Sequence, residues 1–160
     1  MEFENAIPNP EFLIKSIAEQ GYTLETALAY LIDNSISAEA TNIEILFTGE
    51  DGTITLFLAD NGYGMTEAEL SNNMKFPSSD VEESRDKNDL GRFGLGLKTA
   101  SFSQTRRFTV LSRTSDTNDF HSRTWDVNYL RDTQEWRVIK DSFDDIKSSL
   151  NFYDHISNDH

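Results

Sequence analysis

The sequence contains no cysteine, which excludes a disulfide framework and, in practice, a structural zinc site. Its three histidines, at 121, 155 and 160, share no metal-ligand spacing. No apolar run approaches the roughly 18 residues that a membrane span requires. The opening MEFENAIPNP lacks the basic and apolar regions of a signal peptide. We therefore expect a cytoplasmic protein with no membrane partner.

Positive charge is also scarce, with 14 Lys and Arg against 28 Asp and Glu and a net charge of -14. Such a surface repels polyanions, so direct binding to nucleic acid is not expected. Hydrophobic residues make up 37% of 160 residues, which suits a packed chain of modest size. We expect one domain over residues 1–160.

Hydrophobic periodicity predicts the order of the elements. Apolar residues recur at helical spacing after Thr23, alternate on both sides of the turn at Asp51-Gly52, and follow a capping box formed by Thr66 and Glu69. We expect helices beginning near Glu11, Leu24, Glu67 and Leu95, and strands over 42–47, 53–58, 106–113, 120–129 and 135–141. The segment from Ser142 carries no clear pattern. This order favours an α+β two-layer sandwich, an antiparallel or mixed sheet with helices on one face.

Three segments carry candidate chemistry, and the first is GRFGLG at 91–96. Glycines let the backbone approach a phosphate while the amides of the following helix point at its oxygens. Lys98 could supply a phosphate-facing ammonium, with hydroxyls from Thr99 and Ser101 nearby. The motif alone is equally typical of a tight loop before a packed helix, with a solvated lysine.

The second segment is DNGYGM, in which Asp60 ends a predicted strand. Its carboxylate suits the exocyclic amino group of a purine, and the glycines leave room for a flat ligand. Alone, this pattern is more often a turn.

The third is AYLIDNSISA, a helix that places Tyr30 and Asn34 on one face and Asp33 about 100° away. The Asn34 amide oxygen could bind Mg2+, or it could satisfy a neighbouring backbone group.

In this order and context the three segments resemble the GHKL superfamily of ATP-binding domains, named for gyrase, the ninety-kilodalton heat-shock chaperone, histidine kinases and MutL. DNSISAEATNIEI and GRFGLGLKTAS look most similar to the MutL, chaperone and MORC branches. The resemblance covers about residues 24–114 and implies the Bergerat fold, with ATP and Mg2+ as cofactors.

The resemblance also implies site residues. Asn34 would hold Mg2+, Asp60 would accept from the adenine amino group, and 76–90 would form the ATP lid. The nucleotide-binding set is Asn34, Ala38, Asp60, Gly62, Gly64, Met65, Asn73, Gly91, Arg92, Phe93, Gly94, Leu95, Gly96, Leu97, Lys98 and Thr99.

The sequence departs from the family at two places. Hydrolysing members carry a general-base Glu four residues before the Mg2+ asparagine, where this chain has Tyr30, and Glu25 lies nine residues before Asn34. A phenol with a pKa near 10 is a poor base at pH 7. The family also continues into a strand with a Gly-Thr pair, and none follows Ser112. We expect either the front part of a longer protein or an abbreviated member.

Three functions follow from these residues. The first is an ATP-Mg2+ switch that changes homodimerisation or partner binding through the lid, with hydrolysis slow or absent. The second is an active ATPase with another base, and the third is a scaffold that binds proteins and no nucleotide. A histidine-kinase phosphotransfer domain is ranked low, because no dimerising helix with a phosphoacceptor His precedes residue 24.

Overall fold

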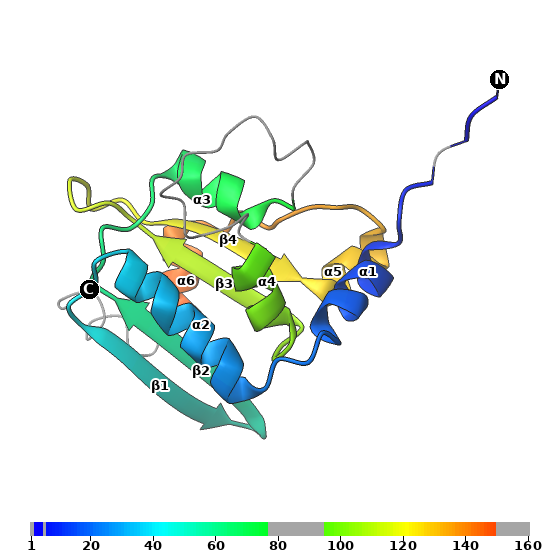
Figure 1. The fold of residues 1–160 in the computed structure, drawn as a ribbon. Coiled ribbons are helices and arrows are strands. Elements are labelled where there is room, and N and C mark those ends of the chain that lie inside the picture. The colour runs from blue at the N-terminus through cyan, green and yellow to red at the C-terminus, as the bar shows by residue number, and fades with distance from the viewer. Residues whose placement is uncertain (1, 5, 77–94, 150–160) are drawn as a thin grey trace.

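In the part of the chain that the structure describes, the strands form two antiparallel hairpins, each a two-stranded sheet, with helices packed against them (Figure 1). The computed structural model describes residues 2–4, 6–76 and 95–149. In chain order its elements are α1 (Pro10–Ala18), α2 (Leu24–Ser37), β1 (Ile43–Glu50), β2 (Thr53–Asp60), α3 (Glu67–Met74), α4 (Leu95–Phe102), β3 (Arg107–Ser112), β4 (His121–Asp126), α5 (Val127–Thr133) and α6 (Phe143–Ser149). None of these helices has the length and apolar content needed to cross a bilayer.

The helix starts follow the capping signals of the sequence. The side chain of Asn9 caps α1 with Pro10 in its first turn, Thr23 caps α2, and Thr66 and Glu69 form both bonds of a capping box on α3. These side chains satisfy amides that have no partner within the helix. The predicted beginnings of these helices are therefore confirmed.

The two hairpins have regular registers. In the first, Ile43 pairs with Asp60 and Glu50 with Thr53, across the Asp51-Gly52 turn. In the second, β3 pairs with β4 from Arg107 opposite Asp126 to Ser112 opposite His121. The α+β class with antiparallel sheets is confirmed.

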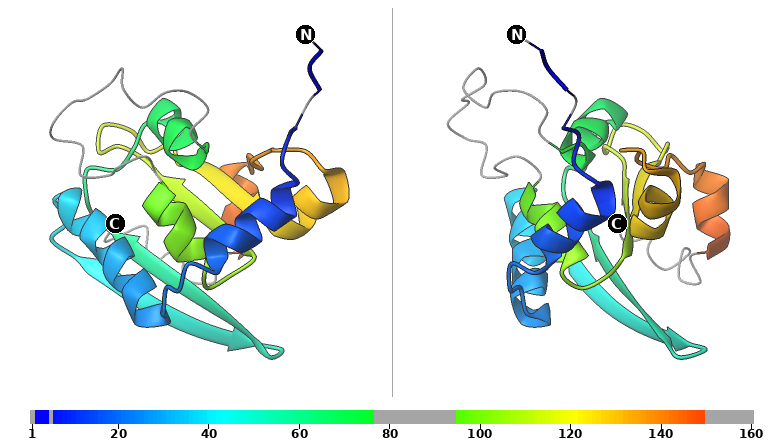
Figure 2. Two further views of the ribbon diagram at one scale, coloured as in Figure 1. Left: turned by 45° about the vertical axis from the view of Figure 1, so that its right-hand side comes forward. Right: turned by 90° about the vertical axis from the view of Figure 1, so that its right-hand side faces the viewer.

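The core forms where helices α1, α3 and α5 and the β3–β4 hairpin meet. Its buried side chains come from α1, α3, α4, β4 and α5: Ile14, Leu70, Met74, Phe102, Trp125, Val127 and Leu130. Helices α2 and α4 lie on one side of the strands, as the two views of Figure 2 show. This arrangement brings α2 and α4 side by side, with the candidate residues of both.

Two predicted strands are wrong in part. The strand expected over 120–129 ends at Asp126, whose carboxylate accepts from the amides of Asn128 and Tyr129 and starts α5. The strand expected over 135–141 is a single bridge between Ile139 and Thr124. The chain turns away after α5 because Gln134 adopts a left-handed conformation with φ of 56°.

Helix α6 was not predicted. It begins after Ser142, whose hydroxyl accepts from the amide of Asp145 at 3.2 Å. It lies on the side of β3–β4 away from α4 (Figure 2), where Phe143 stacks on Phe120 with ring centroids 5.3 Å apart. The described residues therefore carry helices on both sides of this hairpin.

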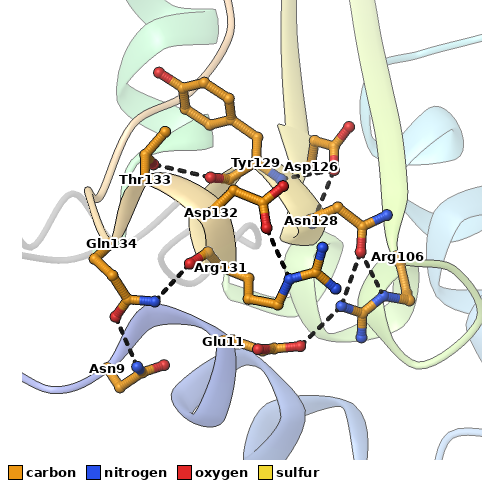
Figure 3. A network of polar contacts seen from close by, with 10 residues as sticks. All are labelled: Asn9, Glu11, Arg106, Asp126, Asn128, Tyr129, Arg131, Asp132, Thr133 and Gln134. Atoms are coloured by element: carbon orange, nitrogen blue, oxygen red, sulfur yellow. Dashed lines mark hydrogen bonds and ion pairs between the residues drawn. The ribbon is translucent and has the colours of Figure 1, made fainter.

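A polar network joins α1 to α5 and to the start of β3 (Figure 3). Arg106 donates to Glu11 at 3.0 Å and to Asn128 at 3.1 Å. Asn9 donates to Gln134 at 2.7 Å. Residues separated by about a hundred positions thus hold α1 in place beside the core.

Candidate functional site

Asp60, the last residue of β2, has both carboxylate oxygens fixed by hydrogen bonds. The hydroxyl of Ser35 on α2 donates to Oδ2 at 2.8 Å, and the amide of Gly62 donates to Oδ1 at 2.9 Å. The side chain is half-buried, so one lone pair on each oxygen remains available to a ligand donor. The carboxylate is therefore oriented before any ligand arrives.

The loop after Asp60 packs against the C-terminal end of α2. A methyl group on Gly62 would lie 2.7 Å from the carbonyl oxygen of Ala38, and the amide of Tyr63 donates to that same oxygen at 2.9 Å. On its other side, the Asn61 side chain accepts from the amide of Thr41 at 2.9 Å. Close backbone approach thus requires glycine at 62.

Gly64 has a stronger requirement, because its φ is +69° and a methyl group there would lie 1.8 Å from the carbonyl oxygen of Arg113. The next amide, of Met65, donates to the hydroxyl of Ser112 on β3 at 2.9 Å. The predicted base-lining segment is thus held between α2 and the end of β3.

Tyr30 and Asn34 lie one turn apart on α2, on the side that faces α4. A methyl group on Gly96 would lie 1.9 Å from the Tyr30 hydroxyl, so the phenol packs directly on the backbone of α4. Burial raises the pKa of Tyr30, with a smaller contribution from Tyr22. The Asn34 side chain is half-buried, and no hydrogen-bond partner for it occurs among residues 2–4, 6–76 and 95–149.

Lys98 and Asn73 lie together, away from Tyr30. The Lys98 ammonium is completely buried, 2.5 Å from the carbonyl oxygen of Asn73 and 5.5 Å from the centroid of the Phe76 ring. Burial lowers its pKa to about 8. The side-chain amide of Asn73 donates to the sulfur of Met65 at 3.2 Å.

The remaining predicted residues lie in or just before α4. Leu95 is exposed, Leu97 packs against the core, and Thr99 is buried. The first part of the predicted phosphate loop lies outside the described residues: Gly91, Arg92, Phe93 and Gly94. The predicted lid over 76–90 lies outside them as well, except for Phe76.

The described candidates therefore form two groups joined by α2 and α4. Asp60, Gly62, Gly64 and Met65 make a preformed loop against Ser35 and Ala38 of α2. Tyr30 links the same helix to Gly96 at the start of α4. Helix α2 thus contacts the Asp60 carboxylate, the close-packed glycine loop that follows it, and the start of α4.

Sequence reasoning missed the side chains that fix this loop. Ser35 orients Asp60 across 25 residues, and Ser112 holds Met65 across 47. The one signal in the sequence that could have indicated a role for Ser35 was its position next to Asn34. Nothing local in the sequence pairs Ser112 with Met65, because that contact depends on how β3 packs beside the loop.

A cavity of about 540 Å3 lies at the C-terminal end of α3, apart from these groups. Its lining includes Met74, Lys75, Phe76, Arg123, Trp125 and Trp136. None of the predicted nucleotide-binding residues that the structure describes lines it. Within the same residues, no three His, Asp or Glu side chains gather where they could hold a metal ion.

The chain is similar in sequence to several known proteins. The chain is 34% identical to the mouse ATPase MORC2B over 104 residues, which is 62% of this chain and 10% of that protein. It is 29% identical to the human structural maintenance of chromosomes flexible hinge domain-containing protein 1 over 72% of this chain and 7% of that protein. It is 32% identical to the yeast DNA mismatch repair protein MLH1 over 64% of this chain and 13% of that protein. The chain thus spans about a tenth of the length of these relatives.

A family model described as histidine kinase-, DNA gyrase B-, and HSP90-like ATPase matches residues 22–158. This match confirms the resemblance read from AYLIDNSISA, DNGYGM and GRFGLG, including the similarity to MORC and MutL proteins. Membership of this family supports ATP binding. The chain belongs to the histidine kinase-, DNA gyrase B- and HSP90-like ATPases, the GHKL superfamily.

Proposed function

We propose that this chain binds ATP with Mg2+ and acts as a nucleotide-dependent conformational or dimerisation switch that hydrolyses ATP slowly or not at all. The observation that carries the proposal is the Asp60 carboxylate, fixed by Ser35 and Gly62 at the end of β2. An oriented acceptor beside a glycine loop suits the amino group of adenine and costs no reordering on binding.

The expected metal ligand is Asn34, whose amide oxygen suits Mg2+. Its half-buried side chain on the α4-facing side of α2 supports this role. Because Mg2+ keeps waters and shares phosphate oxygens, one amide from the protein is enough for the ion to bind with the nucleotide. The phosphates would lie at the start of α4, where helix amides favour anions.

Hydrolysis is expected to be slow because Tyr30 stands where hydrolysing relatives carry a glutamate. Burial raises the pKa of this phenol above its ordinary value, so at pH 7 it stays protonated and cannot remove a proton from water. Its ring also occupies the space between α2 and Gly96. We therefore expect ATP to act mainly through binding, by favouring one of two states of the lid and its partner surface.

Isothermal titration of the protein with ATP in millimolar Mg2+ tests this proposal. We expect saturable binding heat. The affinity for ATP should fall at least about tenfold in Asp60→Asn or Asn34→Ala, because each change removes a charged or metal-coordinating contact. Matched controls are Asp51→Asn, at the exposed tip of the first hairpin, and Asn42→Ala, also exposed. Absence of heat with the unmodified protein would contradict nucleotide binding and favour the scaffold function.

Turnover separates the switch from an active ATPase. We expect turnover near the background rate, raised by Tyr30→Glu if residue 30 holds the base position. Steady turnover by the unmodified protein that Asn34→Ala abolishes would instead support an ATPase with another base. Analytical ultracentrifugation with and without ATP then tests whether nucleotide changes the association state.

A further inference from the structure

Lys98 is a buried cation for which the described part of the chain supplies few compensating groups. Its side chain is the largest of those with no exposed surface, and no carboxylate in the described residues lies within 4.0 Å of its ammonium. Among the described residues its contacts are the carbonyl oxygen of Asn73 and the Phe76 ring. Moving an ammonium out of water costs more than one carbonyl and one ring return.

These contacts hold the C-terminal end of α3, where the last carbonyls lack partners within the helix. Lys98 of α4 donates to the carbonyl of Asn73, and Trp125 of β4 donates from Nε1 to the carbonyl of Met74 at 2.9 Å. The end of α3 is therefore joined to α4 through one side chain and to β4 through another.

Phe76 extends this connection to both tryptophans of the chain. Its ring centroid lies 5.2 Å from that of Trp125 and 5.5 Å from that of Trp136, both edge to face. The Lys98 ammonium lies 5.5 Å from the same ring. All three rings line the 540 Å3 cavity, so movement of Phe76 would change the shape of that cavity.

We propose that Lys98 is a relay, which exchanges the Asn73 carbonyl for a phosphate oxygen when nucleotide binds and thereby frees Phe76 and the end of α3. The proposal rests on the proposed function, because the nucleotide supplies the phosphate. Lys98 lies in the first turn of α4, and its flexible four-carbon stem allows the ammonium to change partners by rotation of the side chain. The phosphate stabilises one state more than the other, which is the requirement for a shift between them.

Tryptophan emission reports this exchange, because Trp125 and Trp136 are the two tryptophans of the sequence. Adding ATP and Mg2+ to the unmodified protein should change the emission with the midpoint measured by calorimetry, and should speed amide exchange over residues 70–76. Phe76→Leu, titrated with ATP until its binding heat saturates, should lose the emission change. Binding heat without changes in emission or exchange, or an emission change that persists in Phe76→Leu, overturns the relay and leaves the proposed function standing. Absence of heat overturns both.

Thermal unfolding without nucleotide distinguishes a relay from a permanent helix cap. Lys98→Met removes a buried charge that no carboxylate of the described residues pairs, so its Tm should rise by about 2–4 °C. Its affinity for ATP should fall at least about tenfold. The control Lys75→Met changes an exposed lysine at the same end of α3 and should shift neither value. A lower Tm in Lys98→Met, or an unchanged affinity for ATP, overturns the relay. If this variant does not fold, amide exchange of the unmodified protein over residues 70–76, with and without ATP, decides whether the relay exists.

Discussion

The hydroxyl of Tyr30 packs on the backbone of Gly96, so that a methyl group added at 96 would lie 1.9 Å from the phenolic oxygen. This contact joins α2 to α4 at the start of the predicted phosphate-binding helix. The effects of substitutions at residues 30 and 96 on the free energy of unfolding should therefore be non-additive.

A double-mutant cycle measures the coupling between Tyr30 and Gly96. Gly96→Ala alone should destabilise the fold by about 1–3 kcal/mol, because the tyrosine ring must leave its position. In a Tyr30→Ala background the same change should be neutral or stabilising by up to about 1 kcal/mol, since alanine favours a helix more than glycine does. Urea unfolding of the four proteins gives the values, and equal effects of Gly96→Ala in both backgrounds would contradict the contact.

Gly64 and Gly52 separate backbone strain from steric overlap. Both have positive φ, of 69° and 78°, but only Gly64 has a neighbour, the carbonyl of Arg113, where a methyl group would be placed. We expect Gly52→Ala to cost about 1 kcal/mol and Gly64→Ala about 3 kcal/mol or more. Chemical denaturation of the two variants provides the comparison, and similar costs would show that the loop relaxes away from β3.

Lys98 should make the fold more stable as the solution becomes alkaline. Burial lowers its pKa to about 8, whereas the unfolded chain keeps this proton up to about pH 10.4. Between these values the unfolded state holds more protons, so stability rises with pH, by at most about 3 kcal/mol from this group. Unfolding free energies measured from pH 7.5 to 9.5 should show the rise, and subtraction of the Lys98→Met series removes the titration of other groups. A constant difference between the two series would contradict the buried charge.

Glu67 should give a pH dependence of the same sign, but in the acid range. Hydrogen bonds from Lys140 and Arg123 lower its pKa to about 2. The stabilising contribution of this carboxylate is therefore complete above about pH 4.5 and is lost as the pH falls through 2. The difference in Tm between the unmodified protein and Glu67→Gln should shrink over that interval. Asp33→Asn, at an exposed position, serves as the control, and a difference independent of pH would contradict the ion cluster.

The sequence was sufficient for the elements whose signals are local. Thr23, Thr66 and the Asp51-Gly52 turn each determine their own neighbourhood, and the expected helices and first hairpin occur where they predict. The segment 120–129 failed because its alternation continues past Asp126, a residue that also caps a helix. Burial of Val127 and Leu130 in the core selects the helix, and no local pattern contains that information.

The candidate site also has parts that local sequence signals predict and parts that depend on packing between distant elements. Asp60 and its glycines were predicted from the loop alone, whereas the orientation of the carboxylate depends on Ser35, which a different element supplies. The burial of Lys98 could not be predicted from the sequence either, because the local pattern shows only a lysine after glycines. Its surroundings come from α3 and Phe76, more than twenty residues earlier.

The network in Figure 3 also bears on the order in which the protein is made. Helix α1 is translated before the residues that hold it: Arg106, the partner of Glu11, follows 95 residues later, and Gln134, the partner of Asn9, follows 125 residues later. Contacts this distant in sequence close a long loop and form late during synthesis. Until then α1 exposes Ile14, which is buried in the folded core, to other proteins of the cell. A nascent chain stalled before Arg106 should therefore be a better substrate for chaperones than one released after Gln134.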